Sequence, residues 1–519
     1  MRKVTSILFT IVTAFFTAQA FASAAPTDGN VVKVSAKWNE IGRVSETVPT
    51  TQLLAHAYTL RSNPLHTTLL KAVRNLHSND TRLQFWYSVT NQAVPELKEP
   101  TATDTSWNFQ NIDPLVSDFF SNTSGKRHVN IGTIPRWMFD VPRVEIPSDP
   151  AASFYPYTDG TKGDLLKDPT GQQIAEYQAR IYQWFTQGGF TDEIGKYHKS
   201  GHHYKIDYWG ILNEPDIENK ISVEEYTRIY DAVAAAIHKI DPNVQFFGPE
   251  VAGAVVPWAD YFLNPKNHSP DALPVQWFSF HNYVEANNDP ATWQVRFFTG
   301  PPPTSNAGGA SARAFVDRVR QVIKIRDELS PKTKVIIDEL GTFNIVKPGE
   351  DACQAPEPYL AYNPRYWNAI GANWAVNFIS AENLGIPVIG MSQMLGYPTQ
   401  CPSISMVNSD TANPNAHYWA LKLINDNFGP GDKLASTQSS SSDIVAQASI
   451  TSHGRKVLLV NTSNETVTVD LANTFQGSGL AVELVDQVSG EHPQRNVRVK
   501  GPQLSLGPFA IAVVREGAN

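Results

Sequence analysis

Apolar side chains recur along this chain in two alternating patterns, a stripe at helical spacing and a short continuous run. In residues 64–78 the stripe consists of Leu65, Leu69, Leu70, Val73 and Leu76. Spacings of three and four residues place these side chains on one face of a helix. The run that follows, LQFWYSV at 83–89, has the aromatic and β-branched content of a strand. The pattern therefore predicts a helix followed by a strand.

The same alternation continues to about residue 428. Besides an early strand within 31–60, the apolar runs predict strands at 83–89, 128–139, 206–212, 244–249, 275–281, 334–339 and 386–391. The amphipathic stretches predict helices at 64–78, 107–120, 174–185, 223–240, 311–329, near 366–381 and at 416–428. Continuous apolar runs are typical of parallel strands that are covered on both faces.

The number of repeats distinguishes between two parallel architectures. Eight strand–helix units favour a (β/α)8 TIM barrel over an open doubly wound sheet. No Gly-rich phosphate-binding loop follows the early strands in the sequence, which is evidence against a nucleotide-binding fold. We therefore expect an α/β protein built on a TIM barrel.

The pattern changes after residue 428. From there on, short stretches alternate apolar and polar residues with turns between them, as in KVLLVN and TVTVDL. This period of two is typical of antiparallel strands with one buried face. The sequence thus predicts a (β/α)8 barrel over residues 26–428 and an accessory C-terminal β-sandwich over 429–519, which the earliest strands could join.

The first 25 residues have the composition of a secretory signal peptide. Arg2 and Lys3 precede an apolar stretch from Ile7 to Phe16, and small residues follow it. This apolar stretch is too short to favour a retained transmembrane helix, and no later one is long enough. We therefore expect a secreted protein, extracellular or periplasmic.

Two cysteines bear on that expectation. Cys353 and Cys401 are the only two in the chain, and export makes a disulfide bond between them plausible. The alternative is two separately buried thiols. Two isolated thiols make a poor metal site, and we predict neither a metal nor another cofactor.

Charge excludes some partners. The formal net charge is −8, and charged residues make up 18% of the chain. Such a chain offers no basic face to nucleic acid or to an anionic membrane surface. A neutral, polar partner fits this composition better.

Polar residues interrupt one apolar strand in an informative way. The run YWGIL at 208–212 ends in Asn213, Glu214, Pro215 and Asp216. In a TIM barrel the active site lies at the carboxyl ends of the strands, so Glu214 at the end of strand four and Glu339 at the end of strand seven would face one opening. Hydrolysis of a glycosidic bond needs such a pair, one carboxyl as proton donor and one carboxylate as nucleophile or electrostatic stabiliser.

These motifs resemble the retaining glycoside hydrolases of clan A. The sequence NEP after strand four and a glutamate ending strand seven are typical of that clan. Five further segments resemble glycoside hydrolase family 39, which includes β-xylosidases and relatives of α-L-iduronidase: WNFQNIDPLVSDFF (107–120), IPRW (134–137), FFGPE (246–250), HNY (281–283) and VIIDEL (335–340). The resemblance implies that Glu214 is the acid/base, that Glu339 is the nucleophile and that Asn213 binds the sugar 2-hydroxyl.

Other residues are weaker candidates. His281 and Tyr283 are two residues apart at the end of strand six and should point to the same side, towards the sugar or the nucleophile. Trp86, Trp137 and Trp293 could stack on sugar faces. Strict alternation along strand seven directs Asp338 out of the barrel. Glu250 and Glu285 are either site carboxylates or solvated loop acids, and we favour the second interpretation for both.

Several positions depart from the family pattern. Leu212 and Leu340 stand where tryptophan is common beside the two glutamates, and strand eight ends in MSQM. Strand two, taken as LQFWYSV, lacks the Arg-x-His of the β-xylosidases. These positions shape the sugar-binding subsite, so the resemblance does not extend to xylosidase activity.

The sequence therefore predicts a secreted retaining glycoside hydrolase that is exo-acting on plant or microbial oligosaccharides or glycosides. The rival within enzymes is another clan A activity, an α-L-arabinofuranosidase or an endo-glycanase. The rival outside enzymes is a non-catalytic barrel that binds carbohydrate without cleaving it. Retention of Asn213, Glu214 and Glu339 argues against that last reading.

Overall fold

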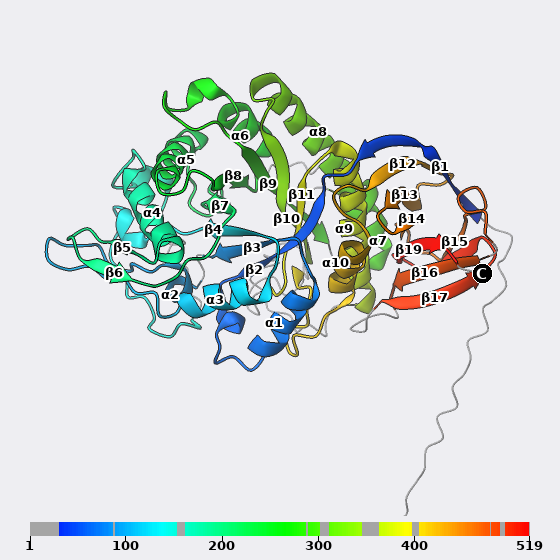
Figure 1. The fold of residues 1–519 in the computed structure, drawn as a ribbon, viewed down its shortest axis with the longest axis horizontal. Helices are drawn as coiled ribbons and strands as arrows, with labels where there is room; N and C mark the ends of the chain where they lie inside the picture. The colour runs from blue at the N-terminus through cyan, green and yellow to red at the C-terminus, as the bar shows by residue number, and fades with distance from the viewer. Residues whose placement is uncertain are drawn as a thin grey trace, which may run out of the picture.

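The computed structural model describes residues 31–86, 89–152, 161–286, 289–301, 311–344, 363–396, 404–477, 479–487 and 494–517. These residues form a barrel with a second, all-β unit packed at one side (Figure 1). The predicted signal peptide and both cysteines lie outside the described residues, so these two predictions stay untested. Within the described part, none of the helices combines the length and the apolar character that crossing a membrane requires.

Eight parallel strands close the barrel, as the fold-class prediction stated. In barrel order they are β2 (Val48–Leu54), β3 (Asp80–Phe85), β4 (Lys126–Ile131), β7 (Tyr208–Ile211), β8 (Gln245–Val251), β9 (Trp277–Ala286), β10 (Lys334–Asn344) and β11 (Val388–Met391), which pairs with β2. The predicted strand two was placed too late, because β3 begins at Asp80 rather than at residue 83. This shift brings Arg82 into the strand.

Eight helices of two turns or more follow the eight barrel strands. They are α1 (His66–Asn75), α3 (Asp113–Asn122), α4 (Gln172–Thr186), α5 (Val223–His238), α6 (Val255–Phe262), α8 (Ala312–Leu329), α9 (Pro364–Leu384) and α10 (Ala416–Asn427). Sequence analysis missed α6, because Pro257 lies inside its apolar stretch; in the first helical turn proline costs no hydrogen bond. The start of α5 is fixed by Ser222, whose side chain accepts a hydrogen bond from the Glu225 amide.

The all-β unit, called here the sheet domain, takes one strand from the N-terminal end of the described chain. It consists of β1 (Val31–Val44), β12 (Lys433–Ser439), β13 (Ile444–Thr451), β14 (Gly454–Asn461), β15 (Val467–Asp470), β16 (Gly479–Val485), β17 (Arg495–Lys500), β18 (Gln503–Leu506) and β19 (Ile511–Glu516). β1 pairs antiparallel with β12 on one side and parallel with β15 on the other. The early strand therefore joins the sheet domain, and β2 opens the barrel.

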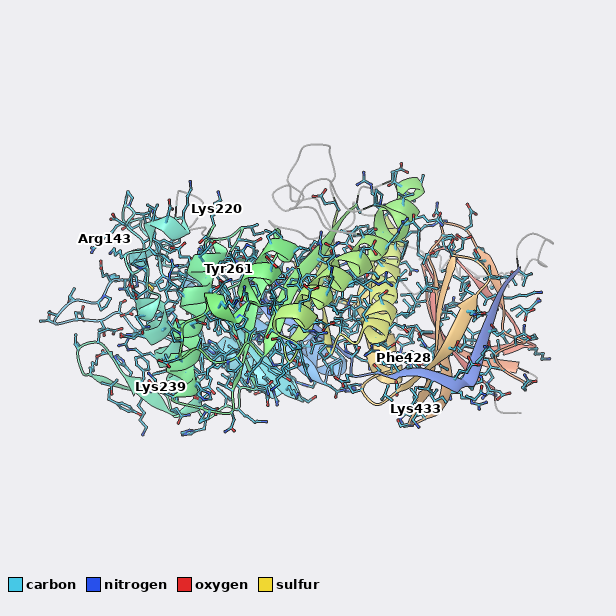
Figure 2. The ribbon with its side chains drawn as sticks, turned by 90° about the horizontal axis from the view of Figure 1, so that it is seen from above. Arg143, Lys220, Lys239, Tyr261, Phe428 and Lys433 are labelled. Atoms are coloured by element: carbon cyan, nitrogen blue, oxygen red, sulfur yellow. The ribbon has the colours of Figure 1, made fainter. Side chains whose placement is uncertain are left out.

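The sheet domain packs on the barrel through α9, α10 and the short segments α7 (Pro290–Trp293) and η5 (Gln294–Thr299). Phe509 is buried in the same apolar cluster as the barrel core and contacts Trp293 and Phe298. Trp293 is fully buried there, so it is a core residue and not a sugar platform. The chain passes from the barrel into the sheet domain between Phe428, at the end of α10, and Lys433, at the start of β12, and both residues are labelled in Figure 2.

Candidate active site

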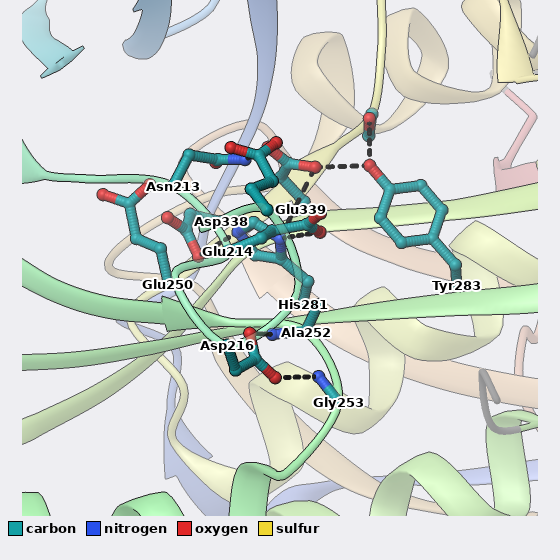
Figure 3. Close-up of polar contacts among 12 residues, drawn as sticks. Asn213, Glu214, Asp216, Glu250, Ala252, Gly253, His281, Tyr283, Asp338 and Glu339 are labelled. Carbon is teal, nitrogen blue, oxygen red and sulfur yellow. Dashed lines mark hydrogen bonds and ion pairs between the residues drawn. The ribbon is translucent and has the colours of Figure 1, made fainter. Parts of the chain in front are cut away.

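The residues after β7 form a tight, well-anchored turn. The backbone of Leu212 and of Glu214 is left-handed, with φ of 61° and 42°. Such strain persists only where surrounding contacts hold it. Asp216 supplies part of that hold, because its carboxylate accepts hydrogen bonds from the amides of Ala252, Gly253 and Ala254 after β8 (Figure 3). The polar end of the strand is thus a structured loop that aims Glu214.

A bulge at the end of β10 changes where its carboxylates point. The register of β10 against β9 shifts between Ile337 and Glu339, and against β11 between Ile337 and Leu340. The expected outward direction of Asp338 is therefore wrong, because an extra residue breaks the alternation of side chains. Asp338 is buried beside Arg82 Nε, 3.8 Å away, and His281 Nε2, 3.6 Å away. Both Asp338 and Glu339 face the interior.

Glu214, His281, Tyr283 and Glu339 meet at this end of the barrel (Figure 3). His281 Nδ1 lies 2.7 Å from Glu214 Oε1 and 3.6 Å from Glu339 Oε2. One oxygen of Glu214 and one of Glu339 lie within 4.8 Å of each other. The Tyr283 hydroxyl donates a hydrogen bond to Glu339 Oε2 and lies 2.6 Å from Ser392 Oγ. The structure thus brings together both predicted catalytic glutamates and the two strand-six side chains.

The surroundings push the pKa values of the two glutamates apart. Burial raises the pKa of Glu214, with a smaller opposing effect from His281. Burial also acts on Glu339, but the positive charges of His281 and Arg82 and the Tyr283 hydrogen bond outweigh it and lower the pKa of that carboxyl. Glu214 is therefore suited to hold a proton and Glu339 to be ionised.

Arg82 is the main site residue that sequence analysis missed. Its guanidinium is 2% exposed and donates to Glu339 Oε1 at 2.5 Å and to Asn213 Oδ1 at 2.7 Å, and it pairs with Glu250. Arg82 therefore fixes the Glu339 carboxylate and the Asn213 amide at once. The sequence gives no local signal for this role, because Arg82 follows the polar residues Asp80 and Thr81 and precedes the apolar run that begins at Leu83.

Glu250 is also a site residue, and its interpretation as a solvated acid was wrong. It is fully buried at the end of β8, where its carboxylate pairs with Arg82 and accepts from Asn130 Nδ2 at 2.8 Å. Although burial opposes ionisation, the charge of Arg82 lowers the pKa of Glu250 to about 2. His128 Nε2 lies 3.5 Å away. Glu285, by contrast, is exposed on β9.

Asn213 has two partners beside the catalytic pair. Its Oδ1 accepts from Arg82, and its Nδ2 donates to Glu218 Oε1 at 3.0 Å. The Trp86 indole donates to the same Glu218 oxygen at 3.3 Å, so Trp86 lies at the site. Trp137 donates instead to the Glu96 carbonyl oxygen at 2.8 Å.

Two triads offer atoms close enough to surround a cation, one made of Glu214, His281 and Glu339 and one of Glu250, His281 and Asp338. Both depend on the same imidazole. Burial opposes its protonation, but the charges of Glu339 and Asp338 raise the pKa of His281 well above its usual value. A protonated imidazole has no lone pair for a metal, so the donor set suits hydrogen bonding.

Comparison with known proteins agrees with this geometry. Residues 193–342, which carry both glutamates, match the family described as glycosyl hydrolases family 39. Residues 441–514 match the D-apionate lactonase, C-terminal immunoglobulin-like domain. No curated protein matches the chain.

Solved structures share the two-part fold at low sequence identity. The GH51 arabinofuranosidase from Xanthomonas axonopodis pv. citri is 12% identical, with a TM-score of 0.59 over 93% of this chain and 99% of that one. The α-L-arabinofuranosidase from Thermotoga maritima is 14% identical, with 0.59 over 94% and 99%. A conserved exported protein from Bacteroides fragilis is 12% identical, with 0.61 over 93% and 99%.

These findings confirm the resemblance drawn from the sequence motifs. The segment that contains Glu214 and Glu339 is similar to glycosyl hydrolases family 39, and the fold is the barrel with a β-sandwich found in the family 51 enzymes. The chain is thus a glycoside hydrolase that resembles family 39 within clan A.

Proposed function

We propose that this protein is a secreted, retaining glycoside hydrolase that acts by double displacement. In the first step a Glu339 oxygen attacks the anomeric carbon, while the bond to the leaving oxygen breaks and that oxygen takes the proton of Glu214. In the second step water gives a proton to Glu214 and its oxygen attacks the same carbon, so that Glu339 leaves with the bonding electron pair. No cofactor enters either step.

The observation that carries this proposal is the spacing of the two carboxyls. Retaining glycosidases hold their carboxyl groups about 5–5.5 Å apart, whereas inverting enzymes leave ~6.5–9.5 Å for a water molecule. One oxygen of Glu214 and one of Glu339 lie within 4.8 Å of each other, and this closeness of the two groups supports the retaining arrangement, in which no water has to fit between them. The opposite directions of their two pKa shifts support the same division of roles.

For the substrate, we propose a class of sugars rather than one sugar. We infer a glycoside or oligosaccharide of plant or microbial origin, cleaved from its end. The second candidate is α-L-arabinofuranosidase activity, since several structural neighbours carry that name. The sequence has long connections after β4, β9 and β10, and connections of this length after barrel strands are typical of loops that shape a substrate site, which favours cleavage from the end of a sugar chain.

Hydrolysis of a panel of aryl glycosides tests the proposal. The panel contains β-xyloside, α-arabinofuranoside, α- and β-galactoside, β-glucoside, β-glucuronide and α-iduronide, assayed with the wild type, Glu339→Gln and Glu214→Gln. We expect release from at least one member and a loss of at least ~10³-fold in kcat with Glu339→Gln. Glu285→Gln, at an exposed carboxylate, is the matched control and should retain activity.

The stereochemistry of the first product separates the mechanisms. A retained anomeric configuration, followed by proton NMR, agrees with the proposal, and an inverted one contradicts it. If polymeric substrates are cleaved only internally, exo action is wrong. A protein that binds sugar equally well as wild type and as Glu339→Gln, and never releases a reducing end, is the non-catalytic barrel.

A further inference from the structure

Glu218 is a carboxyl at the site that the proposed reaction does not use. It lies four residues after Glu214, in the loop between β7 and α5. Its Oε1 accepts two hydrogen bonds, from Asn213 Nδ2 at 3.0 Å and from Trp86 Nε1 at 3.3 Å. Its Oε2 is buried and has no hydrogen-bond partner in the described part of the chain. A buried carboxyl oxygen without a partner is costly, so it calls for a ligand.

The two donors show where this oxygen lies in relation to the reaction. Asn213 directly precedes the proposed acid Glu214, and its other amide atom is bound by Arg82, which also holds Glu339. The nearby charges of Glu214 and Glu339 act on Glu218 as well: burial first, and then these charges, raise the pKa of Glu218. Glu218 is thus coupled electrostatically to both catalytic carboxyls.

The protonation state of Glu218 determines what kind of hydrogen-bond partner its Oε2 needs. Because Oε1 accepts two N–H groups, a proton on this carboxyl would sit on Oε2. An ionised Oε2 accepts a hydrogen bond, and a protonated one donates. A sugar hydroxyl satisfies both states, because it is a donor and an acceptor.

We propose that Glu218 is a specificity-determining residue that binds one hydroxyl of the cleaved sugar through Oε2 and positions the Asn213 amide through Oε1. This inference rests on the proposed function for the identity of the ligand as a sugar. It assigns Glu218 a role in binding the sugar and leaves bond cleavage to Glu214 and Glu339.

Substitutions of Glu218 and substrates that lack one hydroxyl test both proposed contacts, the one to the sugar and the one to Asn213. Glu218→Leu removes both the acceptor for Asn213 and the partner for the sugar. Glu218→Gln keeps an acceptor at Oε1 and places a donor at Oε2, so it should retain activity within about tenfold. Leaving a buried hydrogen-bonding group without its partner costs about 1–3 kcal/mol, which corresponds to roughly 5–150-fold in kcat/KM for Glu218→Leu.

The decisive test asks whether the Glu218→Leu substitution and the loss of one sugar hydroxyl lower kcat/KM independently of each other. The best aryl glycoside is compared with its analogues that lack one ring hydroxyl each, for the wild type and for Glu218→Leu. We expect one deoxy position at which kcat/KM falls ~10-fold or more for the wild type. For the variant kcat/KM should fall little at that position, because the Glu218 carboxyl that binds the hydroxyl is already absent. Equal losses at every position in both proteins would overturn the proposal and leave Glu218 a purely structural residue.

Two controls keep the outcome clear. Glu224→Gln removes one negative charge from an exposed position on α5 and should change nothing. If Glu218→Leu does not fold, Glu218→Asp, which retracts the carboxyl by one methylene, undergoes the same comparison. Calorimetric binding of the free sugar and its deoxy analogue measures the coupling without turnover. Failure of catalysis, and so of the proposed function, is thereby distinguished from failure of hydroxyl recognition.

Discussion

In the proposed mechanism, catalysis requires Glu214 to be protonated and Glu339 to be ionised. The rate depends on Glu339 being ionised, so the acid limb of the pH profile follows Glu339, whose pKa is lowered. It also depends on Glu214 being protonated, so the alkaline limb follows Glu214, whose pKa is raised. Activity should therefore span a window that begins below and ends above the ordinary glutamate value of about 4.3.

Tyr283→Phe should narrow that window from its acid side. The tyrosine donates to the ionised form of Glu339, so its loss raises the pKa of the nucleophile. A hydrogen bond to a charged group, about 1.5–3 kcal/mol, corresponds to a shift of roughly one to two pH units. We expect the acid limb of kcat/KM to move up by about one unit or more. Tyr261→Phe, remote on α6, is the control, and an unmoved limb would contradict the assignment.

Glu250→Gln should cost stability in a pH-dependent way. The variant leaves Arg82 with one counter-ion fewer in a fully buried position, which costs about 3–5 kcal/mol. Because the folded pKa of Glu250 is depressed to about 2, its contribution is complete above the unfolded value of about 4.3 and is lost as pH falls from there towards 2. Denaturant unfolding at several pH values should show that the difference in unfolding free energy between variant and wild type decreases below about pH 4. A gap independent of pH would count against this ion pair.

Sequence reasoning at the residue scale worked where a motif stood at the end of a strand. Asn213, Glu214 and Glu339 were found because polar groups ended apolar runs. Arg82 and Glu250 were missed because each is satisfied by the other across the barrel, from β3 and β8, and no local pattern contains that pairing. Partners so far apart in sequence are visible only after the barrel has closed.

At the scale of elements, period and composition predicted all eight barrel strands, but they could not predict irregularities. The bulge in β10 turns Asp338 inwards, and the left-handed backbone at Leu212, Glu214 and Glu250 redirects the ends of β7 and β8. A regular strand would have placed alternate residues outside. Each irregularity lies at the catalytic end of the barrel, where it increases the number of polar groups that face the interior.

The crowded interior requires a glycine at position 210 on β7, because there is no room for a side chain. A Cβ atom at this position would lie 2.3 Å from Glu250 Oε1 and 2.7 Å from both Asn130 Nδ2 and His128 Nε2. Gly210→Ala should therefore displace Glu250 and, through it, Arg82. We expect a loss of about 1–3 kcal/mol in unfolding free energy and a fall in kcat. Gly429→Ala, where nothing lies within 4 Å, is the matched control; equal behaviour of the two variants would refute the packing argument.

At the scale of the whole molecule, the barrel and the sheet domain share one interior. Side chains of β14 and β19, including Leu458, Val460, Ile511 and Val513, belong to the apolar cluster that fills the barrel's helical layer. Polar contacts reinforce the junction, since Asn368 Nδ2 on α9 donates to the Phe509 carbonyl oxygen at 2.7 Å. An interface of this kind resembles a domain core rather than a contact between independent domains.

Phe509→Ala should therefore destabilise the barrel, although Phe509 belongs to the sheet domain. Its ring is fully buried against Trp293 and Phe298, and truncating a buried phenylalanine costs about 3–5 kcal/mol. We expect activity and secondary structure to be lost together at a lower temperature than in the wild type, because the two parts unfold as one unit. Phe475→Ala, inside the separate core of the sheet domain, is the comparison. If activity survives to the wild-type temperature in Phe509→Ala while the sheet domain melts earlier, the barrel folds independently and the shared interior does not couple the two.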